Sequence, residues 1–145
     1  MDHTEKLNRL IGVYRNELEI YDAIFSIAGQ FEDDWRENPS NSVISDYLSK
    51  RLALDFKLAE QEESIRVEKE WWMTAKQLLD ENDATVSRLK RVLSHVKDKL
   101  TQMLALEDRI TSLLQTRGVP LRPTLPQTEM INQKKASQLY KKYQK

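Results

Sequence analysis

The sequence predicts an all-α protein, an elongated antiparallel helical bundle or hairpin of about three long helices with a flexible C-terminal tail. Two observations favour this fold class. A heptad register runs without a break from Ile44 to Leu114, and a repeat held over this length indicates helices packed on helices. The 145 residues also include only three glycines and four prolines, and three of the prolines fall in one late segment. Long helices are therefore expected over most of the chain.

Alternating steps of three and four residues along this register reach mostly apolar side chains. The apolar positions are Ile44, Tyr47, Leu54, Leu58, Ile65, Trp72, Ala75, Leu79, Val86, Leu89, Leu93, Val96, Leu100, Met103, Ile110 and Leu114. Other positions are polar, among them Glu68 and Glu107. We expect these two glutamates to be hydrated or ion-paired, with Arg51 or Arg109 supplying the positive charge.

A first helix is expected near the N-terminus. Asp2 or Thr4 can cap it, and Asp2 has capping-box spacing to Glu5. Its apolar residues also recur at three- and four-residue steps, with a second row on one flank: Leu7, Ile11, Tyr14, Leu18, Tyr21, Phe25 and Ala28, then Leu10, Ile24 and Phe31. An apolar face this wide suits a multi-helix bundle. We expect the helix to end near Trp35, because Pro39 breaks it, and Ser40 or Ser42 to cap the next one.

The course of the chain after this break has three interpretations. One continuous helix over residues 44–114 would be a rod roughly 105 Å long. A break could instead fall in the polar patch Glu60–Lys69, or in the turn-forming cluster Asp80–Asp83. Trp71 and Trp72 are adjacent, so only one of them can face the centre of a core; the other pads the bundle face or is exposed as an anchor for a partner.

Three segments are predicted: a helical bundle domain at 1–117, a proline-containing linker at 118–127, and a basic, partly helical or disordered tail at 128–145. Gly118 and the prolines after it end the helical part. The chain from 118 onward carries a net charge of +5, against −5 for 1–117. This tail could be solvated or could bind nucleic acid. It could also be a recognition segment with Leu139, Tyr140 and Tyr143 as apolar anchors.

Composition argues against most chemical functions. The absence of cysteine excludes disulfides, thiol catalysis and thiolate metal sites, and neither His3 nor His95 has a second ligand at metal-binding spacing. We therefore expect no catalytic residue, no metal site, no cofactor and no enzyme activity. The net charge is zero, and no signal peptide or membrane-spanning run is present. We expect a cytoplasmic protein that neither inserts into membranes nor binds nucleic acid.

Several of these features together resemble the FlgN-type flagellar export chaperones, which escort hook–filament junction proteins. The residues that carry the resemblance are Glu17-Leu18, Tyr21, Leu58, Glu62, Ile65, Lys69, Trp71-Trp72, Leu104-Ala105-Leu106-Glu107, Arg109 and Leu139-Tyr140. The resemblance implies an antiparallel bundle of long helices, a break in the patch before the tryptophans, and binding rather than catalysis. The lysine-rich end of the chain departs from the more neutral ending expected of that family.

The resulting hypothesis is a secretion chaperone that covers an amphipathic helix of an exported flagellar subunit and prevents premature assembly. Its partner-binding residues are expected to be Leu106, Ile110, Leu113 and Leu114 near the tail, and Leu139, Tyr140 and Tyr143 within it. The tail would occupy the empty groove or dock on the export machinery. The alternative is a structural or adaptor protein that forms a coiled-coil homodimer through the long heptad register.

Overall fold

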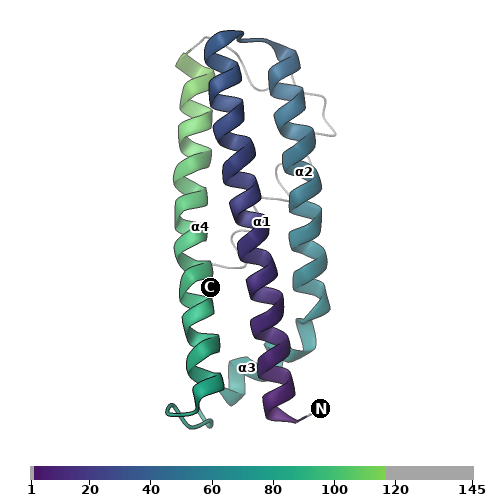
Figure 1. Cartoon of the computed structure of the whole chain (residues 1–145), viewed down its shortest axis with the longest axis vertical. Coiled ribbons are helices and arrows are strands. Elements are labelled where there is room, and N and C mark those ends of the chain that lie inside the picture. The colour runs from purple at the N-terminus through teal and green to yellow at the C-terminus, as the bar shows by residue number, and fades with distance from the viewer. Residues whose placement is uncertain (1, 117–145) are drawn as a thin grey trace.

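The computed structural model describes residues 2–116, which form four α-helices (Figure 1). They are α1 (His3–Glu37), α2 (Asn41–Ser64), α3 (Arg66–Ala75) and α4 (Ala84–Thr116). The all-α prediction is confirmed for this part of the chain. The expected count of about three helices is wrong by one, because the chain leaves helical geometry at Ile65 and separates the short α3 from α2.

Three long helices lie side by side along the length of the molecule, and α3 lies at one end (Figure 1). α1 runs away from that end, α2 returns antiparallel to it, and α4 runs parallel to α1. Two ion pairs show this parallel alignment, because Lys99 meets Asp22 and Arg109 meets Glu32 across the same 77-residue separation. α1 packs against each of the other three helices and is the central element of the bundle.

The helix starts follow the predicted caps. The side chain of Asp2 accepts a hydrogen bond from the Glu5 N–H at 2.8 Å, and Ser40 Oγ accepts one from the Val43 N–H at 3.3 Å. Each cap satisfies one of the backbone donors that a helix start leaves without an internal partner. α1 continues to Glu37, two residues past the expected end at Trp35, and stops just before Asn38-Pro39.

The chain breaks at both predicted places, in the polar patch and in the turn-forming cluster, so residues 44–114 do not form one continuous helix. α2 ends at Ser64 inside the predicted polar patch, as the family resemblance implied. The second break is the turn 76–83, which contains the predicted cluster. There Asp80 Oδ1 accepts from the Asn82 N–H at 2.9 Å, and Asp83 Oδ1 caps α4 by accepting from the Thr85 N–H at 2.8 Å.

The core is one apolar cluster to which all four helices contribute, and α1 and α4 supply equal and largest shares of its buried residues. In α1 the buried face includes the second apolar row, because Leu10, Ile24 and Phe31 are buried. Leu18 and Phe25 of the first row are only half-buried. This buried face lets α1 contact α2 on one side and α4 on the other. Trp72 is buried and Trp71 is half-buried, which confirms that only one of the two tryptophans enters the core.

The linker predicted at 118–127 and the tail predicted at 128–145 lie outside the described residues. None of the helices in the described part of the chain is both long enough and apolar enough to cross a membrane.

Candidate functional site

The region between α2 and α4 is bridged by a charged side chain. Although α1 packs closely along both helices, the backbones of α2 and α4 make few close approaches to each other. Arg51 reaches across this space from α2, and its Nη2 atom donates to Glu107 Oε1 of α4 at 2.7 Å. The same guanidinium donates through Nε to Asp55 Oδ1 at 3.2 Å and through Nη1 to the Tyr47 hydroxyl at 3.2 Å. We call these four side chains the Arg51 cluster.

The Arg51 cluster lies at the boundary between core and solvent. The Arg51 side chain is 9% exposed, whereas the Glu107 side chain is 32% exposed. Burial alone would lower the pKa of Arg51, but the neighbouring Asp55, Tyr47 and Glu107 raise it above its ordinary value, so the guanidinium stays charged. Burial raises the pKa of Asp55, against the opposing effect of Arg51, and it also raises the pKa of Tyr47.

The sequence builds this cluster through helical spacing. Tyr47, Arg51 and Asp55 follow at four-residue steps, so their side chains meet on one face of α2. Aromatic contact with Phe31 of α1, at 4.8 Å between ring centroids, holds the Tyr47 ring in place. The predicted pairing of Glu107 with Arg51 is confirmed. The alternative donor Arg109 instead meets Glu32 of α1, at 2.7 Å.

Apolar side chains border the Arg51 cluster on both helices. On α2, Leu48 and Leu52 are half-buried and Phe56 is 59% exposed. Four-residue spacing places these three in one row on α2, each one residue after Tyr47, Arg51 and Asp55. On α4, the half-buried Leu93 and the 39% exposed Leu104 share the helix edge that carries Glu107. We call the surface formed by Leu48, Leu52, Phe56, Leu93, Leu104 and the Arg51 cluster the α2–α4 face.

The partner-binding residues predicted on the last helix lie in the bundle core. Leu106, Ile110 and Leu114 are buried, and Leu113 is half-buried against the core. In the described conformation these side chains pack inside the bundle, chiefly against α1, and their contact with a partner stays a prediction. The tail residues predicted to bind a partner, Leu139, Tyr140 and Tyr143, lie outside the described residues.

The exposed part of the α2–α4 face was not predicted from the sequence. Leu52, Phe56 and Leu104 lie off the heptad register, which selects the side chains that point into the bundle. A second apolar row at four-residue spacing beside the register, starting at Leu48, was the available signal. Apolar residues outside a register are those left over after the core is packed, and they are candidates for contact with a partner.

A second polar cluster lies where α1, α2 and α3 meet. Glu17 of α1 is fully buried, and Lys69 of α3 forms an ion pair with Glu62 of α2. Burial, followed by the charges of Glu62 and Glu17, raises the pKa of Tyr14. These side chains connect the short α3 to the two long helices beside it.

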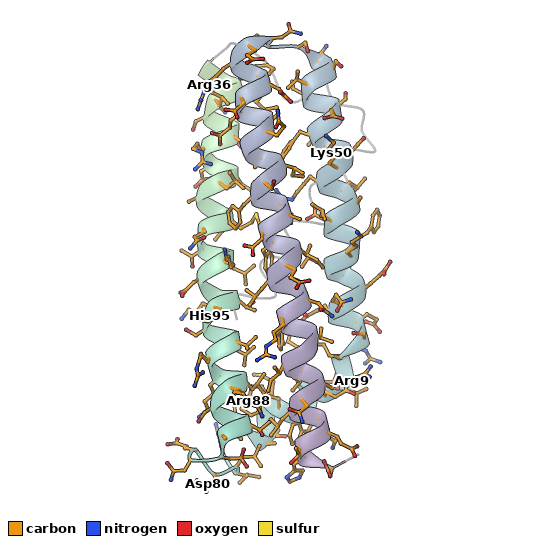
Figure 2. The ribbon with its side chains drawn as sticks, in the orientation of Figure 1. Arg9, Arg36, Lys50, Asp80, Arg88 and His95 are labelled. Atoms are coloured by element: carbon orange, nitrogen blue, oxygen red, sulfur yellow. The ribbon has the colours of Figure 1, made fainter. Side chains whose placement is uncertain are left out.

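Arg9 stabilises the bend between α2 and α3. Its Nη2 atom donates to the Ser64 carbonyl at 2.8 Å, and its Nε atom pairs with Glu68 at 3.1 Å. The expectation that Glu68 is ion-paired is confirmed, with Arg9 as its partner. Figure 2 shows Arg9 on α1 near the α3 end of the bundle. The bend is thus held by one guanidinium that satisfies the end of α2 and the first turn of α3.

The described residues contain no group of histidine, cysteine or carboxylate side chains arranged to hold a metal ion. Figure 2 shows His95 along the outer side of α4, as its position outside the register predicts. Comparison with models of known protein families, with curated proteins and with solved structures finds no match.

Proposed function

We propose that this protein is a non-enzymatic helix-binding chaperone of the flagellar or type III export kind, and that the α2–α4 face holds an amphipathic helix of its cargo. The observation that carries the proposal is the exposure of Phe56 and Leu104 on two helices whose backbones are joined by few close approaches. A cargo helix that lies along both edges adds a fourth long helix to the bundle. An amphipathic helix with anchors at three- and four-residue steps matches such a surface.

The charged cluster gives the face a means of selecting its ligand. Glu107 is partly exposed while it binds Arg51, so a basic side chain beside the cargo's apolar stripe can also pair with its carboxylate. Because α1 carries the main packing of both α2 and α4, their separation can adjust to a ligand while the contacts along α1 persist. Coverage of the apolar stripe of an exported subunit would prevent its premature assembly.

The resemblance to FlgN-type chaperones supplies the cargo class, which is a terminal helix of a hook–filament junction subunit. In this proposal the protein acts in the cytoplasm, before export. The basic tail would occupy the empty binding face or dock on the export machinery.

The experiment measures binding of fluorescently labelled peptides from the terminal helices of junction subunits. The double variant Phe56→Asp/Leu104→Asp should weaken binding more than tenfold, because charges replace the apolar anchors on both edges. The matched control is Val67→Asp, which changes a 64% exposed apolar residue on α3. Circular dichroism should show unchanged helicity for both variants. Equal affinity of wild type and the double variant, or loss of binding with Val67→Asp alone, would contradict this placement of the site.

A further inference from the structure

The turn between α3 and α4 consists of residues that are able to form a helix. The turn, 76–83, contains neither glycine nor proline, and both are absent from the whole stretch 41–116. Its apolar residues fit a turn poorly, because Leu78 is 87% exposed and Leu79 is half-buried. The bent conformation depends on the side chains of Asp80 and Asp83, which accept backbone hydrogen bonds inside the turn and at the start of α4. Figure 2 shows Asp80 at the α3 end of the bundle.

The heptad register passes through this turn without a change of phase. Steps of four, three and four residues lead from Ala75 through Leu79 and Asn82 to Val86. Ala75 and Val86 are both buried in the bundle. If 76–83 became helical, the buried faces of α3 and α4 would therefore form one continuous stripe on a single helix. A turn selected only to reverse the chain would not need to preserve this phase.

The contacts of α4 with α1 do not depend on the connection through the turn. Lys99 Nζ lies 2.7 Å from Asp22 Oδ1 and also lies over the ring of Phe25, while Arg109 meets Glu32. Each contact joins residues more than 70 positions apart in the chain. The α4 helix of a second copy carries the same side chains and can make the same contacts with α1.

We propose that the protein forms a dimer by exchange of α4: residues 76–83 become helical, and α4 of each copy packs on α1 of the other. Arg51 of one copy then meets Glu107 of the other, so the Arg51 cluster is rebuilt across the dimer. This proposal goes beyond the proposed function and does not depend on it. Exchange of an identical element is a low-cost route to dimers, because the contacts it forms are those it replaces.

The balance between the two forms is set by the turn and by concentration. The exchanged form gains helical backbone hydrogen bonds over 76–83 and loses the hydrogen bonds of Asp80 and Asp83. Association favours the dimer in proportion to protein concentration. The wild-type chain should therefore show a monomer that converts to a dimer as concentration rises, with slow exchange because α4 must leave α1.

The first test uses substitutions in the turn. The Asp83 N–H donates to the Asp80 carbonyl at 3.1 Å, so Glu81 is the second residue of a four-residue turn. Proline is favoured at this position of a turn, but it disrupts a helix interior. Glu81→Pro should raise the dimer dissociation constant about 100-fold or more. The control Glu81→Ala, with a strong helix former, should leave or strengthen dimerisation.

The second test uses the absence of native cysteine. Glu32→Cys and Arg109→Cys variants are prepared separately, mixed, and held at high concentration after a cycle of unfolding and refolding. A short bis-maleimide then cross-links cysteines that lie close together. A covalent heterodimer forms only if α4 of one copy packs on α1 of the other. The same mixture made with Glu81→Pro in both chains is the control.

The outcomes separate the alternatives. A concentration-dependent dimer by light scattering that cross-links in the mixture and disappears with Glu81→Pro supports exchange. A wild-type protein that stays monomeric at all concentrations overturns it. A dimer that persists with Glu81→Pro and gives no mixed cross-link also overturns it, because that dimer associates side by side. Monomeric Glu81→Pro should still bind cargo peptides, because the α2–α4 face is present in the monomer. The peptide-binding test and the dimerisation test can therefore fail separately.

Discussion

Replacement of Arg51 by alanine should destabilise the bundle more than any exposed charge substitution. The change removes the guanidinium that binds Asp55, Tyr47 and Glu107, so the buried Asp55 carboxylate loses its charge-compensating contact with Arg51. Removal of one member of a buried pair costs about 3–5 kcal/mol, because the remaining charge is desolvated and uncompensated. With a urea m-value of about 2 kcal/mol/M, the midpoint of unfolding should fall by about 2 M. The assay is equilibrium urea unfolding followed by circular dichroism.

Two further variants distinguish the cause of this loss. Lys50→Ala removes an exposed cation on the same helix, which pairs with Asp46 at 3.0 Å, and should cost less than about 1 kcal/mol. The apolar triple variant Arg51→Met/Asp55→Leu/Glu107→Leu removes all three charges together and should recover most of the stability. If Arg51→Ala costs no more than Lys50→Ala, the cluster does not join α2 to α4 energetically, and the reasoning is refuted.

Three other predictions follow from single contacts. Burial raises the pKa of Asp55, so the Asp55 carboxyl group stays protonated to higher pH in the folded state than in the unfolded chain. Protonation of Asp55 therefore contributes fully to stability at low pH, and this contribution is lost as pH rises through the raised pKa. Urea midpoints over a pH series should fall less steeply across that window for Asp55→Asn than for wild type, and parallel profiles would exclude this effect. Arg9→Ala should speed amide hydrogen exchange at the bend between α2 and α3, where its hydrogen bond is lost, while Arg15→Ala, at an exposed site, should not. Ser40→Ala should lower the unfolding free energy by about 1 kcal/mol through loss of the α2 cap, and the exposed Ser45→Ala change should cost less; equal losses would contradict the role of the cap.

The sequence was sufficient to predict the features that depend on local spacing. The caps at Asp2 and Ser40 and both chain breaks after α2 follow from residues close together in the chain. Arg51 was one of two predicted partners for Glu107; it occupies the inward-facing register, whereas the other candidate, Arg109, lies outside that register. A polar residue in such a register needs a partner of opposite charge nearby, and few candidates exist.

The rotation of each helix about its axis could not be predicted in the same way. A wide apolar face allows a helix to turn by several tens of degrees and still bury apolar side chains. On α2 the structure buries Asp55 and leaves Leu54 half-buried, because Asp55 accepts a hydrogen bond from Arg51 inside the bundle. The predicted binding residues Leu106 and Ile110 are buried for a related reason, since the sequence alone does not show that α1 lies between α2 and α4.

The central position of α1 has a consequence for folding during synthesis. α1 and α2 emerge consecutively from the ribosome and can pair at once, but the side of α1 that receives α4 stays uncovered until residue 116 has been made. At 5–20 residues per second, the interval after the end of α2 is roughly 3–10 s. Throughout that time the α1 side chains that contact α4, Phe25 among them, lack their native cover. The translation rate over residues 65–116 therefore sets how long the apolar side of α1 that contacts α4 stays exposed in each new chain.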